Sequence, residues 1–152
     1  MRSKFLTLGL ISSVLLLSAC ESLPTADNQL SAQNLAALQE RTWIATHLGN
    51  IELQTASTSR NIPSLQFNAS NQVKGADGCN RVMGAYQVQG DKLEFSQLAS
   101  TKMACIDDNG VPQQFGEALS KVKHYQVFNK TLKLLDQHGN LLIQFSSPVV
   151  PR

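Results

Sequence analysis

Cysteine is the residue type whose chemistry this sequence points to first. The chain has three, Cys20, Cys79 and Cys105, and the first of them ends an apolar N-terminal segment that is typical of export. In an oxidising compartment the other two are expected to pair, so we predict a structural disulfide between Cys79 and Cys105. Two alternatives stay open at this point. Redox-active thiols usually occur as Cys-x-x-Cys, which is absent, and a metal site needs more ligands at close spacing.

Side chains for acid–base catalysis are few. The histidines His47, His124 and His138 lie in or beside predicted turns and junctions, where an exposed histidine is ordinary. Asp107-Asp108 precedes Asn109-Gly110 without the twelve-residue ligand pattern of a calcium loop, which favours a solvated turn. Catalysis would need His124 or His47 beside Cys79, Asp107 or Ser100. Because no motif of a hydrolase, a zinc protease or a phosphate-binding loop occurs, we expect no enzyme, no catalytic residue, no metal and no cofactor.

The N-terminus carries an export signal. Arg2 and Lys4 precede the apolar run Phe5 to Leu17, which is shorter than the roughly 20 residues that a membrane-spanning helix needs. The run ends in Leu17-Ser18-Ala19-Cys20, which resembles a bacterial lipobox, so we expect a signal peptide over residues 1–19 and lipid on Cys20. An ordinary thiol beside a conventional cleavage site is the alternative. Glu21-Ser22 after the cysteine favours the periplasmic face of the outer membrane over retention at the inner membrane.

Composition limits the remaining chain to one small domain. The full sequence has 13 Lys and Arg against 11 Asp and Glu, and removal of Arg2 and Lys4 with the signal makes the two equal. No basic stripe is left to follow a phosphate backbone, so nucleic acid is not an expected partner. We expect a monomer whose contacts are the membrane, through the N-terminal lipid, and an envelope protein.

The expected elements are mostly short strands. Residues 20–40 read as a lipidated tether, with a short helix over Ala32 to Glu40 capped by Ser31. The domain is expected over residues 41–147, with a tail over 148–152, and Pro112 is expected to open its one firm helix. Strands are predicted where apolar residues alternate with polar ones or form short runs, namely Trp43 to Leu53 with a break at Gly49-Asn50, Ser64 to Asn68, Val73 to Gly75, Arg81 to Val88, Lys92 to Phe95, His124 to Phe128, Leu132 to Leu135 and Leu141 to Phe145. Six to eight strands with one or two helices predict an antiparallel α+β domain, a strongly curved sheet or open barrel covered by helix.

Two motifs carry a family resemblance. Gly75-Ala76-Asp77-Gly78-Cys79-Asn80-Arg81 with Gly84-Ala85-Tyr86, followed by Ala99-Ser100-Thr101-Lys102-Met103-Ala104-Cys105, resemble the META domain of HslJ-like (DUF306-type) envelope proteins. The resemblance extends from about Arg41 to Phe145. It implies a role in heat-shock or envelope-stress responses and in tolerance of novobiocin. The fold is also similar to that of lipoproteins that pilot secretin rings into the outer membrane.

The same motifs have a physical interpretation as a pinned corner. Gly78 permits a sharp turn beside Cys79, and Asn80 can hydrogen-bond its local backbone to hold that turn. Ser100 and Thr101 are expected to do the same before Cys105. Arg81 and Lys102 are the charged groups that would serve a ligand at this corner.

Three functions follow from these expectations. The first is a non-enzymatic binding or adaptor lipoprotein, and the second is an assembly factor similar to a secretin pilot. The third is carriage of a small apolar ligand inside the sheet. An interior void lined by Phe67, Val88 and Leu134 would favour carriage, and a filled core would favour an adaptor.

Overall fold

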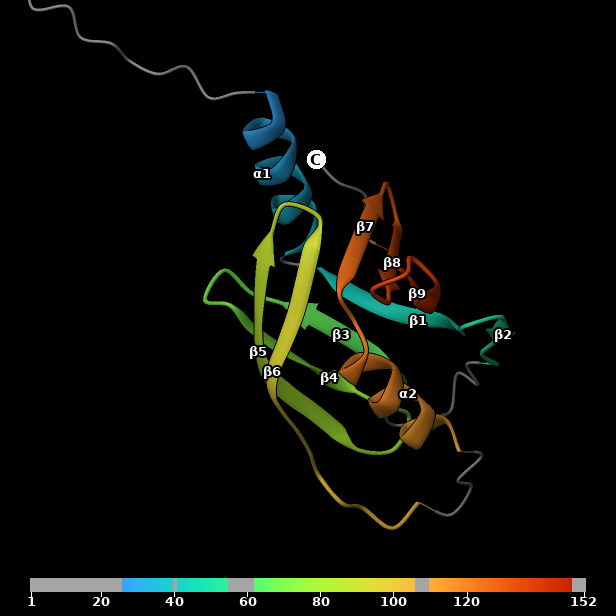
Figure 1. Ribbon diagram of the computed structural model, residues 1–152. Coiled ribbons are helices and arrows are strands. Elements are labelled where there is room, and N and C mark those ends of the chain that lie inside the picture. Colours follow the sequence, from blue (N-terminus) through green and yellow to red (C-terminus); the bar gives the residue numbers. More distant parts are fainter. Residues whose placement is uncertain (1–25, 40, 55–61, 106–109, 149–152) are drawn as a thin grey trace, which may run out of the picture.

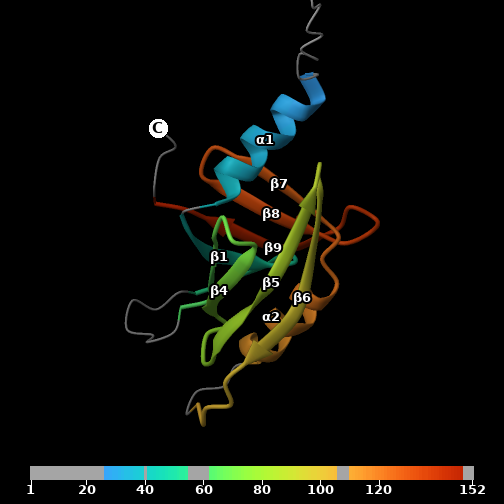
Figure 2. The same ribbon diagram turned by 90° about the vertical axis from the view of Figure 1, so that its left-hand side faces the viewer.

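The sheet of this protein closes on itself. The computed structural model describes residues 26–39, 41–54, 62–105 and 110–148. Its strands pair in the order β2-β1-β3-β4-β5-β6-β7-β8-β9, and β9 also pairs with β1 (Figures 1 and 2). Every strand pairing is antiparallel. The elements are α1 (Ala26–Leu38), β1 (Thr42–Leu48), β2 (Ile51–Glu52), β3 (Ser64–Phe67), β4 (Gln72–Ala76), β5 (Arg81–Gln89), β6 (Lys92–Ser100), α2 (Val111–Ser120), β7 (His124–Phe128), β8 (Thr131–Leu135) and β9 (Leu141–Ser146). The predicted α+β class, with a strongly curved antiparallel sheet and two helices, is confirmed.

The barrel is closed unevenly. Strands β6 and β7 share a single residue pair, Lys92 with His124, whereas β5 and β6 are paired along most of their length. Helix α2 carries the chain from β6 to β7 and buries Phe115 and Leu119, which lie one turn apart on the same face. The ring of Phe115 meets Phe145 of β9 edge-on at 6.2 Å. Pro112 lies in the first turn of this helix, as predicted.

The interior of the barrel is filled by side chains. Trp43, Phe67, Tyr86 and Phe145 are at most 1% exposed and belong to one apolar cluster. Phe67 packs edge-on against Tyr86 at a ring distance of 5.0 Å. This alternation of inward apolar and outward polar residues along the strands is what the period-two pattern of the sequence predicts.

Helix α1 lies at the end of the barrel opposite α2 (Figures 1 and 2). Its last residue, Leu38, is fully buried in the core, and its carbonyl oxygen accepts a hydrogen bond of 2.8 Å from the indole nitrogen of Trp43. The side-chain amide of Gln39 donates to the hydroxyl of Tyr86 at 2.7 Å. These contacts make the C-terminal end of α1 part of the folded domain.

Three details differ from the sequence predictions. The first helix begins at Ala26, because no glycine or proline interrupts the alanine-rich stretch after Pro24. Ser31 therefore lies inside the helix, and the predicted cap is wrong. The strand predicted to end at Phe95 continues to Ser100, because it stays paired with β5 through a bulge. The short β2 adds a ninth strand. Residues 55–61, between β2 and β3 in the sequence, lie outside the described residues. Within the described part of the chain, neither helix has the length and apolarity to cross a bilayer.

Two glycines differ in the space around them, so substitutions at both measure how tightly the barrel is packed. A methyl group on Gly75 of β4 would lie 1.9 Å from the carbonyl oxygen of Ser64 in β3, whereas one on Gly116 in α2 would meet nothing within 4 Å. We expect Gly75→Ala to lower the free energy of unfolding by about 2 kcal/mol or more, because backbone must move. The matched control Gly116→Ala should raise it by about 0.5–1 kcal/mol. Urea unfolding followed by circular dichroism measures both, and equal effects would contradict the close approach of β3 and β4.

Candidate functional site at the disulfide corner

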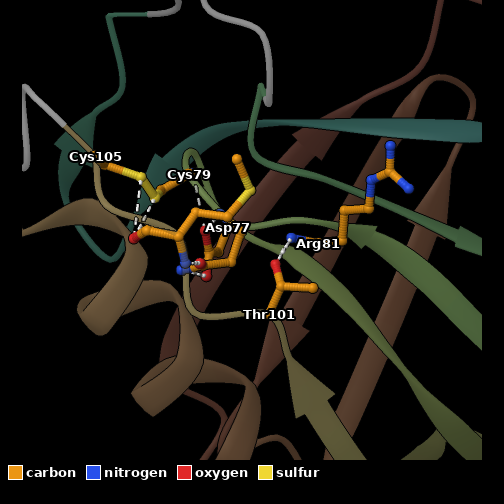
Figure 3. Close-up of a disulfide and its surroundings, with 7 residues drawn as sticks. Asp77, Cys79, Arg81, Thr101 and Cys105 are labelled. Carbon is orange, nitrogen blue, oxygen red and sulfur yellow. Dashed lines mark hydrogen bonds between the residues drawn. A yellow bond between two sulfur atoms is a disulfide. The ribbon is translucent and has the colours of Figure 1, made fainter.

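The two motif segments meet at one corner of the barrel. A turn over residues 77–80 joins β4 to β5, and the loop after β6 runs alongside it (Figure 3). Cys79 and Cys105 form a disulfide with their Cα atoms 6.0 Å apart. The predicted pairing is therefore present, and it joins the two loops in which the sequence motifs lie.

Asp77 organises the turn. It is 4% exposed, and one carboxyl oxygen accepts hydrogen bonds from the backbone N–H groups of Cys79 and Asn80 at 2.9 and 2.6 Å. The other oxygen accepts a bond of 3.1 Å from the side-chain amide of Asn80. No role for Asp77 was expected from the sequence. The signal was present, since an aspartate two and three residues before backbone donors in a glycine-containing segment is typical of a side-chain-closed turn.

Asn80 links the turn to the second loop. Its side-chain oxygen accepts a hydrogen bond of 2.8 Å from the backbone N–H of Met103. The sequence predicts a bond from Asn80 to its own local backbone. That prediction is wrong for this oxygen, because its donor lies 23 residues further along the chain. The amide of Asn80 therefore bridges Asp77 and the loop before Cys105, and the corner has a polar connection as well as a covalent one.

The other predicted site residues lie nearby in different roles. The hydroxyl of Thr101 accepts a bond of 3.0 Å from the backbone N–H of Arg81, so it extends the pairing of β5 with β6 instead of closing a local turn. Ser100 lies opposite Val82 at the end of β6, and Lys102 is exposed. Gly78 has φ = 107°, a backbone conformation that L side chains rarely adopt.

The corner has the chemistry of a scaffold. Both disulfide sulfurs lie 3.7 Å from the carbonyl oxygen of Met103, and the carboxyl group of Asp77 is engaged by three donors. Among the described residues, no three His, Cys, Asp or Glu side chains come together as metal ligands would. The side chain of Arg81 extends away from the disulfide, as Figure 3 shows.

The histidines lie apart from this corner. His124 contacts Asp91 at 3.1 Å, His47 contacts Thr46 at 3.0 Å, and His138 lies 4.0 Å from Asp136. Cys79, which the catalytic alternative would need as a neighbour, is joined to Cys105. Asp107 and Asp108 lie outside the described residues.

Burial perturbs two phenols inside the barrel. It raises the pKa of Tyr86, against the opposing effect of the hydrogen bond from Gln39. It also raises the pKa of Tyr125, whose buried hydroxyl has no hydrogen-bond partner among the described groups. Both phenols stay neutral at physiological pH, so the interior holds no charge from either of them.

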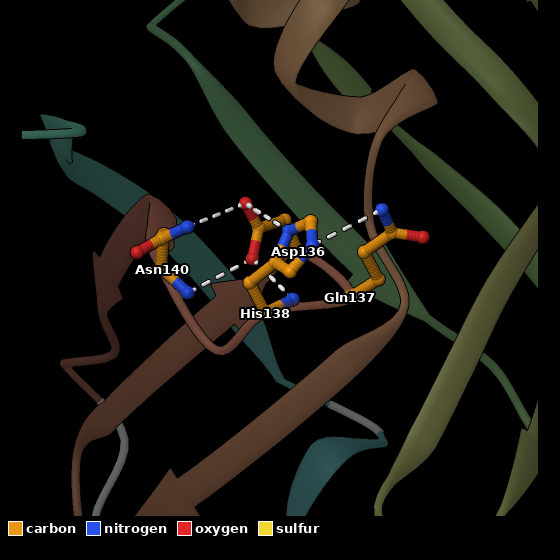
Figure 4. Close-up of polar contacts among 4 residues, drawn as sticks. All are labelled: Asp136, Gln137, His138 and Asn140. Carbon is orange, nitrogen blue, oxygen red and sulfur yellow. Dashed lines mark hydrogen bonds and ion pairs between the residues drawn. The ribbon is translucent and has the colours of Figure 1, made fainter.

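A second side-chain-closed turn joins β8 to β9 (Figure 4). Asp136 accepts hydrogen bonds from the backbone N–H groups of His138 and Asn140 at 2.8 and 2.9 Å, and from the side-chain amide of Asn140 at 2.9 Å. The bonds from Asn140 lower the pKa of Asp136. This turn repeats the pattern at Asp77 without a disulfide, so the same local chemistry closes a turn in both places.

Comparison with known proteins agrees with this architecture. A solution NMR structure of a protein from Burkholderia xenovorans is 19% identical, covers 95% of this chain and 99% of its own, and superposes with a TM-score of 0.62. A crystal structure of a DUF4847-family protein from Bacteroides vulgatus is also 19% identical, covers 72% of this chain and 93% of its own, and gives a TM-score of 0.54. At such identities the likeness is one of fold. The comparison with curated proteins gave no match.

The class that the fold and corner define is a small closed antiparallel barrel with two loops joined by a disulfide. The family model of the META domain matches residues 36–148, which include the C-terminal part of α1, the barrel and both motif loops. The chain belongs to the META domain family.

The disulfide should contribute a large part of the domain's stability. The two cysteines are 26 positions apart, and closing a loop of that length stabilises by about 3.5 kcal/mol in the chain-entropy model. We expect the double variant Cys79→Ala/Cys105→Ala to lose about that free energy of unfolding in urea. The reduced wild-type protein should match the variant, and an unchanged unfolding midpoint in both would contradict the structural role.

The Asp136 turn predicts a pH dependence of stability. Because the folded pKa is lowered, the contribution is fully present above the ordinary carboxyl value of about 3.9 and is lost as the pH falls through the folded value. We expect the urea midpoint of the wild type to fall more between pH 5 and pH 2 than that of Asp136→Asn, whose neutral amide still offers an acceptor oxygen. Parallel curves for the two proteins would refute this assignment.

Proposed function

We propose that this META-domain protein is a lipid-anchored lipoprotein on the periplasmic face of the outer membrane, where it acts as a non-enzymatic binding or adaptor module. One observation carries the proposal. Two of the three cysteines of the sequence, Cys79 and Cys105, form the disulfide, and the third, Cys20, directly follows Leu17-Ser18-Ala19. A structural disulfide favours an oxidising compartment, and the lipobox-like segment favours acylation of the remaining cysteine.

The filled interior supports binding at the surface over carriage inside the barrel. Phe67 and Leu134, which would line a ligand cavity, are fully buried in one packed cluster, and Val88 packs against that cluster. A small apolar ligand would have to displace aromatic side chains that already contact one another. The dispersed histidines and the paired thiols support a protein without catalytic activity.

The family membership supports a place in the envelope. The HslJ-like resemblance adds a role in the envelope-stress response and in novobiocin tolerance, and bringing a partner to the outer membrane, as a secretin pilot does, is one form of the adaptor function. We expect a strain that lacks this protein to be more sensitive to novobiocin and to be restored by the wild-type gene. Equal sensitivity with and without the protein would remove the stress role and leave the anchoring untouched.

Lipidation is the most direct test of the anchoring. Mass spectrometry of the protein purified from its native membranes should find an N-terminal Cys20 that carries a diacylglycerol group. Cys20→Ser should be released from the membrane fraction, since the acyl chains supply the anchor. As a control for folding, Cys20→Ser should keep the Cys79–Cys105 disulfide. A mature N-terminus without lipid would overturn the proposal.

In-cell crosslinking tests the adaptor function. The anchored wild type and the Cys20→Ser variant are compared for the envelope proteins that they capture. We expect the anchored form to recover a partner that the released form loses or recovers weakly. If both recover the same partners in equal amount, anchoring does not position the protein for its task.

A further inference from the structure

A groove runs along the outside of the barrel over β3, β4 and β5. Two adjoining hollows form it, with volumes of about 510 and 590 Å³. Gln66, Lys74 and Met83 border both hollows, so the groove is continuous across them. At about 3.3 Å per residue, β4 spans roughly 13 Å from Gln72 to Ala76, the length of about five residues of extended peptide.

The strand register explains which side chains face this groove. Thr42, Gln66, Lys74 and Met83 are neighbours in successive strand pairs, so they form one row across the outer face of the sheet. Gly75 and Gly84 also border the groove, but they pair with buried residues and so follow the inward side of their strands. A methyl group on either would meet the backbone of a neighbouring strand, at 1.9 Å for Gly75 and 3.0 Å for Gly84, so at these positions the groove is lined by backbone.

The groove combines apolar surface with positive charge. Met83 is 54% exposed, one of the few large apolar side chains with that exposure. Lys74 and Arg81 are exposed, and they are the charged residues among the described lining of the groove, which contains no Asp or Glu. The described salt bridges lie elsewhere, at Lys123, His124 and His138. The charge of the groove is therefore complementary to an acidic ligand.

The position of the groove favours a protein over a lipid surface. Arg81 begins β5 beside the loop that follows β6, and Figures 1 and 2 place this loop and α1 at opposite ends of the barrel. If the chain is anchored through its N-terminus, as proposed above, the Arg81 end faces away from the membrane. A polypeptide can reach it there and the anchoring bilayer cannot.

We propose that this groove binds an acidic, extended polypeptide segment of another envelope protein. Lys74 and Arg81 pair with carboxylates of the segment, and Met83 contacts an apolar side chain between them. The inference deepens the adaptor function proposed above and names the surface through which it acts. Because the pairs are exposed, they contribute selectivity and salt-dependent association more than tight binding.

An NMR titration tests the groove on the complete mature protein in detergent micelles. The probe is an acetylated, amidated hexapeptide of alternating aspartate and valine, and the comparison peptide has asparagine in place of aspartate. We expect the acidic peptide to shift the amide signals of Lys74, Gly75 and Met83 and to bind more weakly as salt is added. The neutral peptide should bind at least several-fold more weakly.

Charge reversal locates the site. The variant Lys74→Glu/Arg81→Glu should raise the Kd of the acidic peptide by about tenfold. The matched control Lys130→Glu/Lys133→Glu makes the same charge change in β8 and in the turn before it, and should leave the Kd unchanged. If the reversed variant loses the dispersed amide spectrum of the wild type, Lys74→Gln/Arg81→Gln replaces it.

Three outcomes would overturn the proposal. The first is equal binding of the acidic and neutral peptides, and the second is equal weakening by the control variant. The third is that phosphatidylglycerol vesicles shift the same amide signals while the peptide does not, which would make this face a membrane contact. None of these outcomes depends on the lipid at Cys20, so failure of the groove and failure of the anchoring are measured separately.

Discussion

The carboxyl group of Asp77 holds together the turn between β4 and β5, in addition to the backbone bond of 3.1 Å from the N–H of Asp77 to the carbonyl oxygen of Asn80. It is buried, and it accepts two backbone hydrogen bonds and one from the side chain of Asn80, which in turn accepts a bond from Met103 in the second loop. A buried polar group without partners is costly, so each member of this network needs the others. The disulfide joins the same two segments, and the bond from the N–H of Cys79 to Asp77 fixes the backbone at one end of that disulfide.

The corner also determines what the outer face of the barrel presents. Arg81 directly follows the turn. Its backbone N–H donates to the hydroxyl of Thr101, and its carbonyl oxygen accepts from the backbone N–H of Thr101. Its side chain therefore leaves from a position held by the Asp77 network, and Lys74 and Met83 face the same groove through the strand register. At the opposite end, the Trp43 bond to Leu38 fixes the helix that leads toward the N-terminus. In the function that we propose, the two ends of the barrel serve separate tasks, attachment at one and recognition at the other.

Much of this architecture could be predicted from the sequence, because local chemistry decides it. The alternation in Ser64 to Phe67, the turn at Gly49-Asn50, Pro112 at the start of α2 and the pairing of Cys79 with Cys105 each follow from residue types at known spacing. The start of α1 was mispredicted although its local signal was present, since no glycine or proline interrupts the chain between Pro24 and Leu38. The burial of Leu38 was not predictable in the same way, because it meets its partners only in the closed barrel. The hydrogen bond from the N–H of Met103 to the side-chain oxygen of Asn80 joins residues far apart in sequence, so no local pattern predicts it. The groove over β3 to β5 depends on the register of four strands, which brings Gln66, Lys74 and Met83 into one row only once the sheet is formed.

Amide hydrogen exchange tests the central claim about Asp77 most directly. In the oxidised wild-type protein, we predict slow exchange of the backbone N–H groups of Cys79, Asn80 and Met103. In Asp77→Ala with the disulfide intact, exchange at all three should accelerate by about tenfold or more, because the acceptor is gone and Asn80 is no longer held. Asp77→Asn, which keeps an acceptor oxygen, should fall in between. If the three amides stay protected in Asp77→Ala, the disulfide alone holds the corner and the role assigned to the Asp77 carboxyl group is wrong.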